Sequence, residues 1–281
     1  MEKIIILVLL VVLMFSCTIN ENIGTTTTTI TKDDSNDLTS DYIFNDAKHH
    51  KVEITIDTAI YSKVISDYKS WNNDPKYRLA ESFTIDGVTV KNIGIKGRGQ
   101  TTKDVDKISL KIAFDCTDPL GATNSIVTGL YDNKERKFCK VKKLNLRSTT
   151  NDPTLIREFM AYKIYREHNV PAPRSSTATV YVNGKSMGVY LVVEEITKRM
   201  VDRWFKDDTG NLYKCGWDNA GASFREGSYN STRYSLQTNE ELNNTSDIKS
   251  LMTELEKVND KSSLSNLMDM NNQLPPAKQV V

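Results

Sequence analysis

The chain of 281 residues lacks several features on which common protein functions depend. Its 37 Lys and Arg residues are balanced by 36 Asp and Glu residues, so it has no excess of positive charge for binding nucleic acid. Its three histidines, His49, His50 and His168, are scattered and no Cys-x-x-Cys pair occurs, so a transition-metal site is not expected. The apolar run from Ile4 to Phe15 is too short to span a bilayer. Function must therefore be argued from individual sites.

This apolar run follows Lys3 and is typical of the core of a signal peptide, which predicts that the chain is exported. Ser16 and Cys17 come directly after it, and a cysteine at this place resembles a bacterial lipoprotein cleavage site. Two interpretations stay open. Either Cys17 is lipidated and anchors the protein to the cell envelope, or residues 1–17 are cleaved and the protein is secreted. In the first interpretation, the lipid on Cys17 would be the part of the protein that contacts a membrane.

Four cysteines are present, and Cys116, Cys139 and Cys215 remain once Cys17 is set aside. An odd number in an oxidising compartment allows at most one internal bridge. Cys116 and Cys139 bracket a polar insert that contains glycine, so the favoured prediction is a disulfide between them. The alternative is three buried free thiols.

Residues 18–45 are rich in Thr, Asn, Asp and Ser, and we expect them to form a flexible tether because they offer little apolar area to bury. The chain then alternates polar and apolar residues from Val52 to Ile56, which predicts a strand, and a helical pattern ends near Trp71. Asp86-Gly87 predicts the turn of a hairpin that continues to Ile95.

The central stretch, from Leu144 to Glu195, combines a strand, a helix and a second hairpin. Asp152 followed by Pro153 is a typical helix start. The apolar residues that follow recur at helical spacing and predict one buried face: Leu155, Ile156, Phe159, Met160 and Ile164. Asn183-Gly184 lies between two runs of β-forming residues and predicts a tight hairpin turn.

Several motifs of this stretch and its surroundings occur together in one order. They are Gly94-Ile-Lys-Gly97-Arg98-Gly99, Lys107-Ile-Ser-Leu-Lys111-Ile, Leu144-Asn-Leu-Arg147, Asp152-Pro-Thr-Leu-Ile-Arg157-Glu158, Asn183-Gly184 with Gly188-Val-Tyr190, Glu194-Glu195 and Asn211-Leu-Tyr-Lys214. In type and order they resemble the CotH family of spore-coat and cell-surface proteins, which are atypical protein kinases. The resemblance implies an α+β fold in which residues 46–215 form a kinase-like small lobe, a mostly antiparallel sheet with a packed helix. Residues 216–281 would form part of a helical large lobe.

The resemblance also implies a site for ATP and magnesium, because phosphoryl transfer needs cations and backbone amides around the phosphates. A loop containing Gly97, Arg98 and Gly99 would close over the phosphates, although a plain β-turn explains the glycines as well. Lys111, in the middle of a strand, is favoured over Lys107 at its edge as the lysine that contacts phosphate. A solvated strand face is the alternative for both. Glu158 would pair with this lysine, and the strand end at Glu194 would meet the adenine ring.

The Asn-x-Asp and Trp-Asp-x-Asp motifs that carry the catalytic and metal-binding aspartates in the CotH family have no counterpart here, since Asp247, Asp260 and Asp269 match neither context. No catalytic or metal-binding residue is therefore assigned within the chain. The first hypothesis is an exported CotH-family protein that is inactive or incomplete as a kinase by itself. The second is a non-enzymatic module or adhesin that binds coat or cell-surface proteins.

Overall fold

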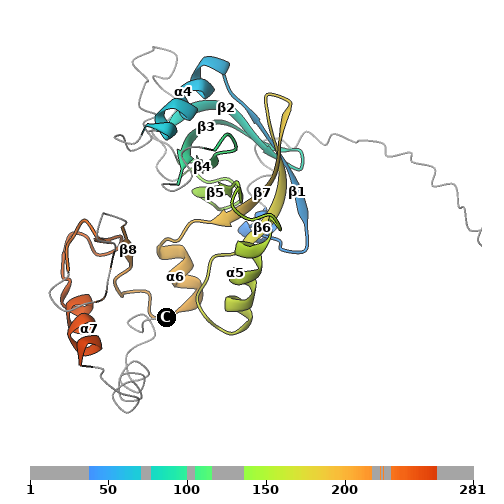
Figure 1. Cartoon of the computed structure of the whole chain (residues 1–281). Coiled ribbons are helices and arrows are strands. Elements are labelled where there is room, and N and C mark those ends of the chain that lie inside the picture. Colours follow the sequence, from blue (N-terminus) through green and yellow to red (C-terminus); the bar gives the residue numbers. More distant parts are fainter. Residues whose placement is uncertain are drawn as a thin grey trace, which may run out of the picture.

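The computed structural model describes residues 38–70, 77–99, 105–115, 136–216, 222, 224 and 229–257. These residues form a β-barrel with helices at its ends and a smaller C-terminal unit (Figure 1). The helices are α3 (Ser40–Ile43), α4 (Thr58–Lys69), α5 (Arg157–Glu167), α6 (Lys198–Trp204) and α7 (Ser246–Glu256). The strands are β1 (His49–Thr55), β2 (Arg78–Ile85), β3 (Val88–Arg98), β4 (Ser109–Ala113), β5 (Lys143–Arg147), β6 (Ser175–Val182), β7 (Lys185–Glu194), β8 (Tyr213–Cys215) and β9 (Tyr234–Leu236).

The first seven strands close into a barrel in the order β1-β2-β3-β4-β5-β7-β6. Neighbouring strands are antiparallel except β1 and β6, which pair in parallel from His49 with Thr177 to Ile54 with Val182. The predicted kinase-like α+β lobe with packed helices is therefore wrong, because β1 pairs with both β2 and β6 and leaves no open sheet. Pairing between segments about 130 residues apart leaves no local pattern in the sequence.

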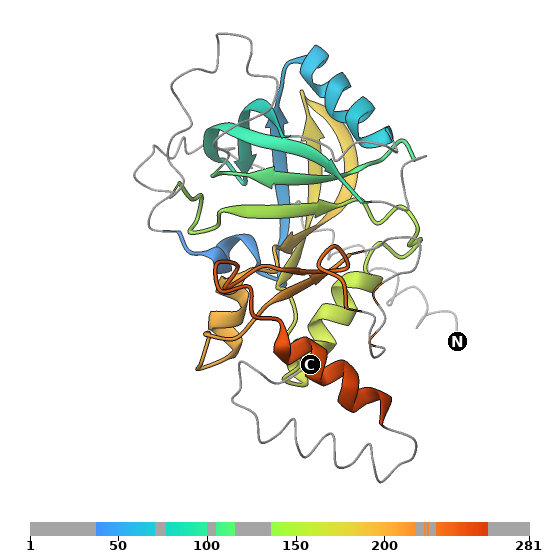
Figure 2. The ribbon, with the colours of Figure 1, turned by 90° about the vertical axis from the view of Figure 1, so that its left-hand side faces the viewer.

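The core fills the interior of the barrel, where alternate residues of each strand meet. The hairpin predicted around Asp86-Gly87 is confirmed as β2 and β3, and that around Asn183-Gly184 as β6 and β7. Helix α4 adds Val64 and Tyr68 to the core and lies against β2 and β3. Figure 2 shows α4 at one end of the barrel, with α5 and α6 toward the opposite end.

Helix α5 departs from its prediction in two ways. It begins at Arg157, so Asp152-Pro153 is not the start of the helix. Instead, the Asp152 carboxylate accepts hydrogen bonds from the backbone amide of Thr154 at 3.0 Å and that of Arg157 at 2.7 Å. The predicted buried face is also wrong, because no residue of α5 is buried. Ile156, Met160 and Ile164 are 44%, 42% and 47% exposed.

The predicted tether 18–45 is wrong over its last residues. Helix α3 lies within that range, and Ile43 and Phe44 belong to the core. Residues 18–37 lie outside the described residues.

The C-terminal unit has a small core of its own, formed by Tyr234, Ile248 and Met252. Two residues of the Asn-Leu-Tyr-Lys motif hold this unit together, because Asn211 and Tyr213 both donate hydrogen bonds to the Asp247 carboxylate on α7, at 3.0 and 2.6 Å. Lys214 is exposed. In the described part of the chain, every helix is too short or too polar to cross a membrane.

Candidate functional site

Charged side chains gather on the outer face of the barrel where β3, β4 and β5 lie side by side. Strand register places Lys96 opposite Lys111, and Lys111 opposite Asn145. Because Leu110 and Ile112 point into the core, Lys111 between them points outward. Arg98 is paired in the same way with Ser109. The fold thus aligns cations from neighbouring strands on one surface, which we call the Lys111 face.

The centre of the Lys111 face is an ion pair between Lys111 and Glu195. The Nζ of Lys111 lies 2.6 Å from Oε1 of Glu195, and the two side chains are 19% and 23% exposed. The side-chain amide of Asn145 donates to Oε2 of Glu195 at 2.9 Å, while its Oδ1 is buried without a hydrogen-bond partner. A buried acceptor without a partner is unusual in folded proteins.

Burial affects the two partners differently. It lowers the pKa of Lys111, although the charge of Glu195 opposes this. Burial alone would raise the pKa of Glu195, but the charge of Lys111 and the hydrogen bonds from Lys111 and Asn145 hold that pKa below its ordinary value. Each charge therefore favours the charged form of its partner, and the pair fixes the direction of the lysine.

Glu158 does not pair with Lys111 as predicted. Its carboxylate accepts a hydrogen bond from Nε of Arg147 at 3.1 Å and one from the hydroxyl of Tyr162 at 2.8 Å. The cation that reaches Glu158 is instead Arg147, the last residue of β5. Arg98 is mostly buried next to these groups, and its burial and the nearby Arg147 lower its pKa. Glu195 and Glu158 act in the opposite direction.

The predicted glycine loop is largely strand. Gly94 and Gly97 lie within β3, and Gly97 has a packing role, because a Cβ there would lie 2.4 Å from Cβ of Tyr68 on α4. Gly99 follows the strand with a φ of 114°, a conformation suited to glycine. Phosphate binding by Arg98 and Gly99 stays a prediction.

Lys107 is held by the barrel itself. Its ammonium donates to the carbonyl oxygen of Val189 at 2.5 Å and lies 4.6 Å from the centre of the Tyr190 ring. Burial lowers its pKa. These contacts leave Lys111 as the better candidate for a phosphate contact on this face.

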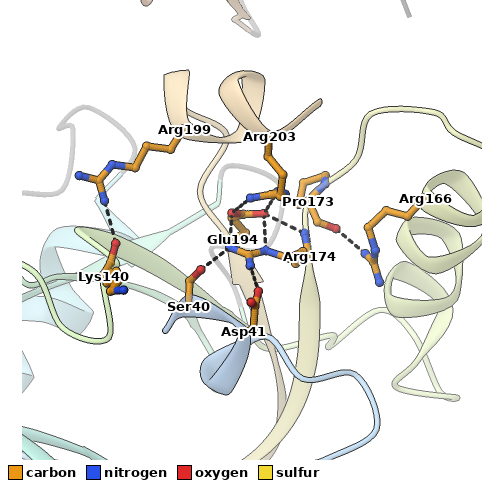
Figure 3. Close-up of polar contacts among 9 residues, drawn as sticks. All are labelled: Ser40, Asp41, Lys140, Arg166, Pro173, Arg174, Glu194, Arg199 and Arg203. Atoms are coloured by element: carbon orange, nitrogen blue, oxygen red, sulfur yellow. Dashed lines mark hydrogen bonds and ion pairs between the residues drawn. The ribbon is translucent and has the colours of Figure 1, made fainter. Parts of the chain in front are cut away.

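Glu194 lies at the end of β7, and two arginines hold its carboxylate (Figure 3). Nη2 of Arg174 donates to Oε1 at 2.8 Å, and Nη1 of Arg203 donates to the same atom at 2.8 Å. Burial would raise the pKa of Glu194, but the hydrogen bonds from Arg203 and Arg174 lower it. Contact of the strand end at Glu194 with adenine stays a prediction, and the carboxylate of Glu194 is engaged by the two arginines.

Among the cysteines, Cys17 and Cys116 lie outside the described residues. Cys139 is buried as a free thiol, and burial raises its pKa to about 12. Because Cys116 is not described, the pairing of Cys116 with Cys139 stays a prediction.

Sequence reasoning missed Asn145 and the two arginines that hold Glu194. Asn145 lies within the Leu-Asn-Leu-Arg motif, and an asparagine inside an apolar strand was the available signal. Arg174 and Arg203 carry no such signal, because they belong to separate elements that only the fold brings to Glu194.

Comparison with known proteins identifies a family. No curated protein matches the chain. The model of the family described as CotH kinase protein matches residues 95–274. This range includes the Lys111 face from Lys96 to Glu195 and covers more than half of the chain. The chain therefore belongs to the CotH kinase protein family.

Proposed function

We propose that this CotH-family protein binds the phosphate groups of ATP on its Lys111 face. The observation that carries the proposal is the half-buried ion pair of Lys111 and Glu195, beside the half-buried Arg98. A lysine held by a carboxylate is oriented before a ligand arrives, which lowers the entropic cost of binding. Lysine and arginine are also the side chains that most often contact phosphate.

The residues fit a nucleotide better than they fit magnesium. Lys111 and Arg98 supply positive charge, and the side-chain amide of Asn145 helps to hold the Glu195 carboxylate that orients Lys111. Within the described ranges, no group of three His, Cys, Asp or Glu side chains could hold a metal ion. ATP would supply the phosphoryl group in a transfer reaction. The role assigned to these residues is to bind and orient its phosphates, and no step is assigned to magnesium.

The test is a titration of the purified chain with ATP by isothermal calorimetry, in the presence of magnesium. Lys111→Ala should weaken binding at least ~10-fold, equivalent to about 1.4 kcal/mol, because it removes the oriented cation. Glu195→Gln should also weaken binding, since the lysine loses the partner that fixes its direction.

The matched control is Lys51→Ala. Lys51 pairs with Glu53 at 2.8 Å and is 57% exposed on β1, so its removal changes the net charge equally without touching the Lys111 face. Wild-type affinity in Lys111→Ala, or no binding of ATP to the wild type, would reject the proposal. The second result would favour the alternative function, a non-enzymatic module that binds coat or cell-surface proteins.

We also propose that the protein is exported and acts at the cell envelope or spore coat. The signal-like run from Ile4 to Phe15 supports export, and Cys17 supports a lipid anchor. Expression of the whole chain in a bacterium tests this: the wild type should partition into detergent, and Cys17→Ser should appear in the aqueous phase. Equal aqueous partitioning of both would exclude the anchor, and retention of both inside the cell would exclude export.

A further inference from the structure

A cavity of about 350 Å³ lies at the end of the barrel where β7 meets α6. This volume is within the range of roughly 300–1,000 Å³ that is usual for small-molecule sites. The cavity touches the Lys111 face through Lys143 and Glu195, but its other walls come from α3, the turn before β5 and α6. We call it the basic cavity.

The lining is strongly cationic. It contains seven Lys and Arg residues against three Asp and Glu residues, although the whole chain has a net charge of only +1. One of the three carboxylates, Glu194, is shared by the guanidinium groups of Arg174 and Arg203. Other cations of the lining are paired with carboxylates outside it: Arg174 contacts Asp41, and Lys198 contacts Asp202 and Asp208. Among the described residues, Arg199 and Lys140 have no carboxylate partner, so the charge that an anionic ligand would neutralise lies at these two side chains.

One cation at the rim, Arg199, is held in place by a backbone contact. Nη1 of Arg199 on α6 donates to the carbonyl oxygen of Lys140 at 2.7 Å, and Figure 3 shows this contact beside the Glu194 cluster. A carbonyl is a neutral acceptor, so this bond orients the guanidinium without cancelling its charge. The contact also joins α6 to the turn that carries Lys140, and so fixes the width of the cavity.

The turn at Lys140 has an unusual backbone. Cys139 and Lys140 both have positive φ angles, 48° and 61°, in a position where a tight turn normally takes Asn and Gly. The buried Phe138 anchors the turn, with its ring 5.2 Å from that of Phe114. Strain of this kind is found preferentially at ligand sites, where the surrounding structure maintains it. Here it presents a lysine at the rim of the cavity.

Phe44 and Val141 are the apolar residues of the lining, and the guanidinium of Arg174 lies 4.9 Å from the centre of the Phe44 ring. The charged ends of the Lys and Arg side chains would select a ligand that carries negative charge. Arginine and lysine together are suited to phosphate oxygens.

From these observations we infer that the basic cavity is a second anion site, which binds a small phosphate compound such as pyrophosphate. The same chemistry could come from a free phosphate compound or from the phosphate tail of a nucleotide. The inference does not depend on ATP binding to the Lys111 face. Its test distinguishes binding in the basic cavity from binding on the Lys111 face.

The test titrates the full chain with inorganic pyrophosphate by calorimetry at 0.15 M salt, where weak surface attraction is screened. Lys140→Ala combined with Arg199→Ala should weaken binding at least ~10-fold. Arg199→Lys alone should retain most of the affinity, because it keeps the charge. Circular dichroism of each variant checks that it is folded, as expected for exposed side chains.

Two comparisons make the result decisive. The pair Lys51→Ala and Lys185→Ala removes the same charge elsewhere and should leave pyrophosphate binding within about twofold. If the ligand is a nucleotide tail, ATP should compete with pyrophosphate and the cavity variant should weaken both. If the ligand is a free phosphate compound, the double variant Lys140→Ala with Arg199→Ala should leave ATP binding unchanged. No binding of pyrophosphate, unchanged binding in the cavity variant, or an equal loss in the distant pair would overturn the inference.

Discussion

Helices α4 and α5 have nearly the same length, 12 and 11 residues, and both sequences place apolar residues at helical spacing. The barrel nevertheless uses them in opposite ways. Helix α4 buries Val64 and Tyr68 in the core, whereas α5 buries no residue and exposes Met160 by 42%. Periodicity thus identifies the apolar face of a helix, but whether that face is covered depends on the surface that the rest of the fold provides.

The difference has a local cause on each side. Gly97 leaves room on β3 for Tyr68, so α4 can approach the barrel closely. Helix α5 instead contacts β5 through polar groups, with the Glu158 carboxylate between Arg147 and Tyr162. Apolar packing should therefore hold α4, and hydrogen bonds should hold α5.

The largest expected effect comes from comparing one tyrosine on each helix. Tyr68→Ala should lower the free energy of unfolding by about 3–5 kcal/mol, because the side chain is fully buried and leaves a cavity. Tyr165→Ala on α5 should change it by less than about 0.5 kcal/mol, since this side chain is 51% exposed. Urea denaturation measures both, and equal losses would contradict the contrast between the helices.

The next effect tests the close approach of α4. Gly97→Ala should cost about 3 kcal/mol, because its Cβ would meet Tyr68 at 2.4 Å and strand or helix must move. Gly184→Ala is the control: there is open space around it, but its φ of +78° disfavours alanine, at a cost of about 1 kcal/mol. A smaller loss at Gly97 than at Gly184 would show that α4 shifts freely.

The same contrast shows what the sequence could and could not predict. Strand β1, helix α4 and both hairpins were predictable, because each follows from a local pattern such as Asn183-Gly184. Closure of the barrel was not, because it depends on pairing of β1 with the distant β6. Within the site, Lys111 was predicted in the middle of its strand, but its partner Glu195 was not predicted, because only the pairing of β4 with β5 and of β5 with β7 brings the end of β7 to Lys111.

The third prediction concerns the hydrogen bonds at the start of helix α4. Asp57 accepts hydrogen bonds from the backbone amides of Ala59 and Ile60 at 2.9 and 3.0 Å, so Asp57→Ala should cost about 1 kcal/mol in the free energy of unfolding. Asp57→Ser is the control, because its hydroxyl can still accept, and should recover most of this loss. A neutral effect of Asp57→Ala in urea denaturation would show that packing alone holds the start of α4.

The start of α5 should respond to pH. The hydrogen bond from the Thr154 hydroxyl, with the amides of Thr154 and Arg157, holds the pKa of Asp152 below its ordinary value. The stabilisation is therefore fully present above the ordinary pKa and is lost as pH falls through the lowered one. In an NMR titration, Thr154→Ala should raise the pKa of Asp152, and the amide of Arg157 should lose its bonded shift at a higher pH. An unchanged titration would mean that Thr154 does not act on Asp152.

The smallest expected effect is on the exposed face of α5. Ile156→Ser and Ile164→Ser should each change the free energy of unfolding by less than about 0.5 kcal/mol, because side chains 44% and 47% exposed lose little buried area. Val64→Ser on α4 is the matched control, and it should cost several-fold more because Val64 is 1% exposed. The α5 variants should also bind less of a dye that reports exposed apolar surface. A loss at Ile164 as large as that at Val64 would mean that α5 is covered in solution, and the contrast between the two helices would fail.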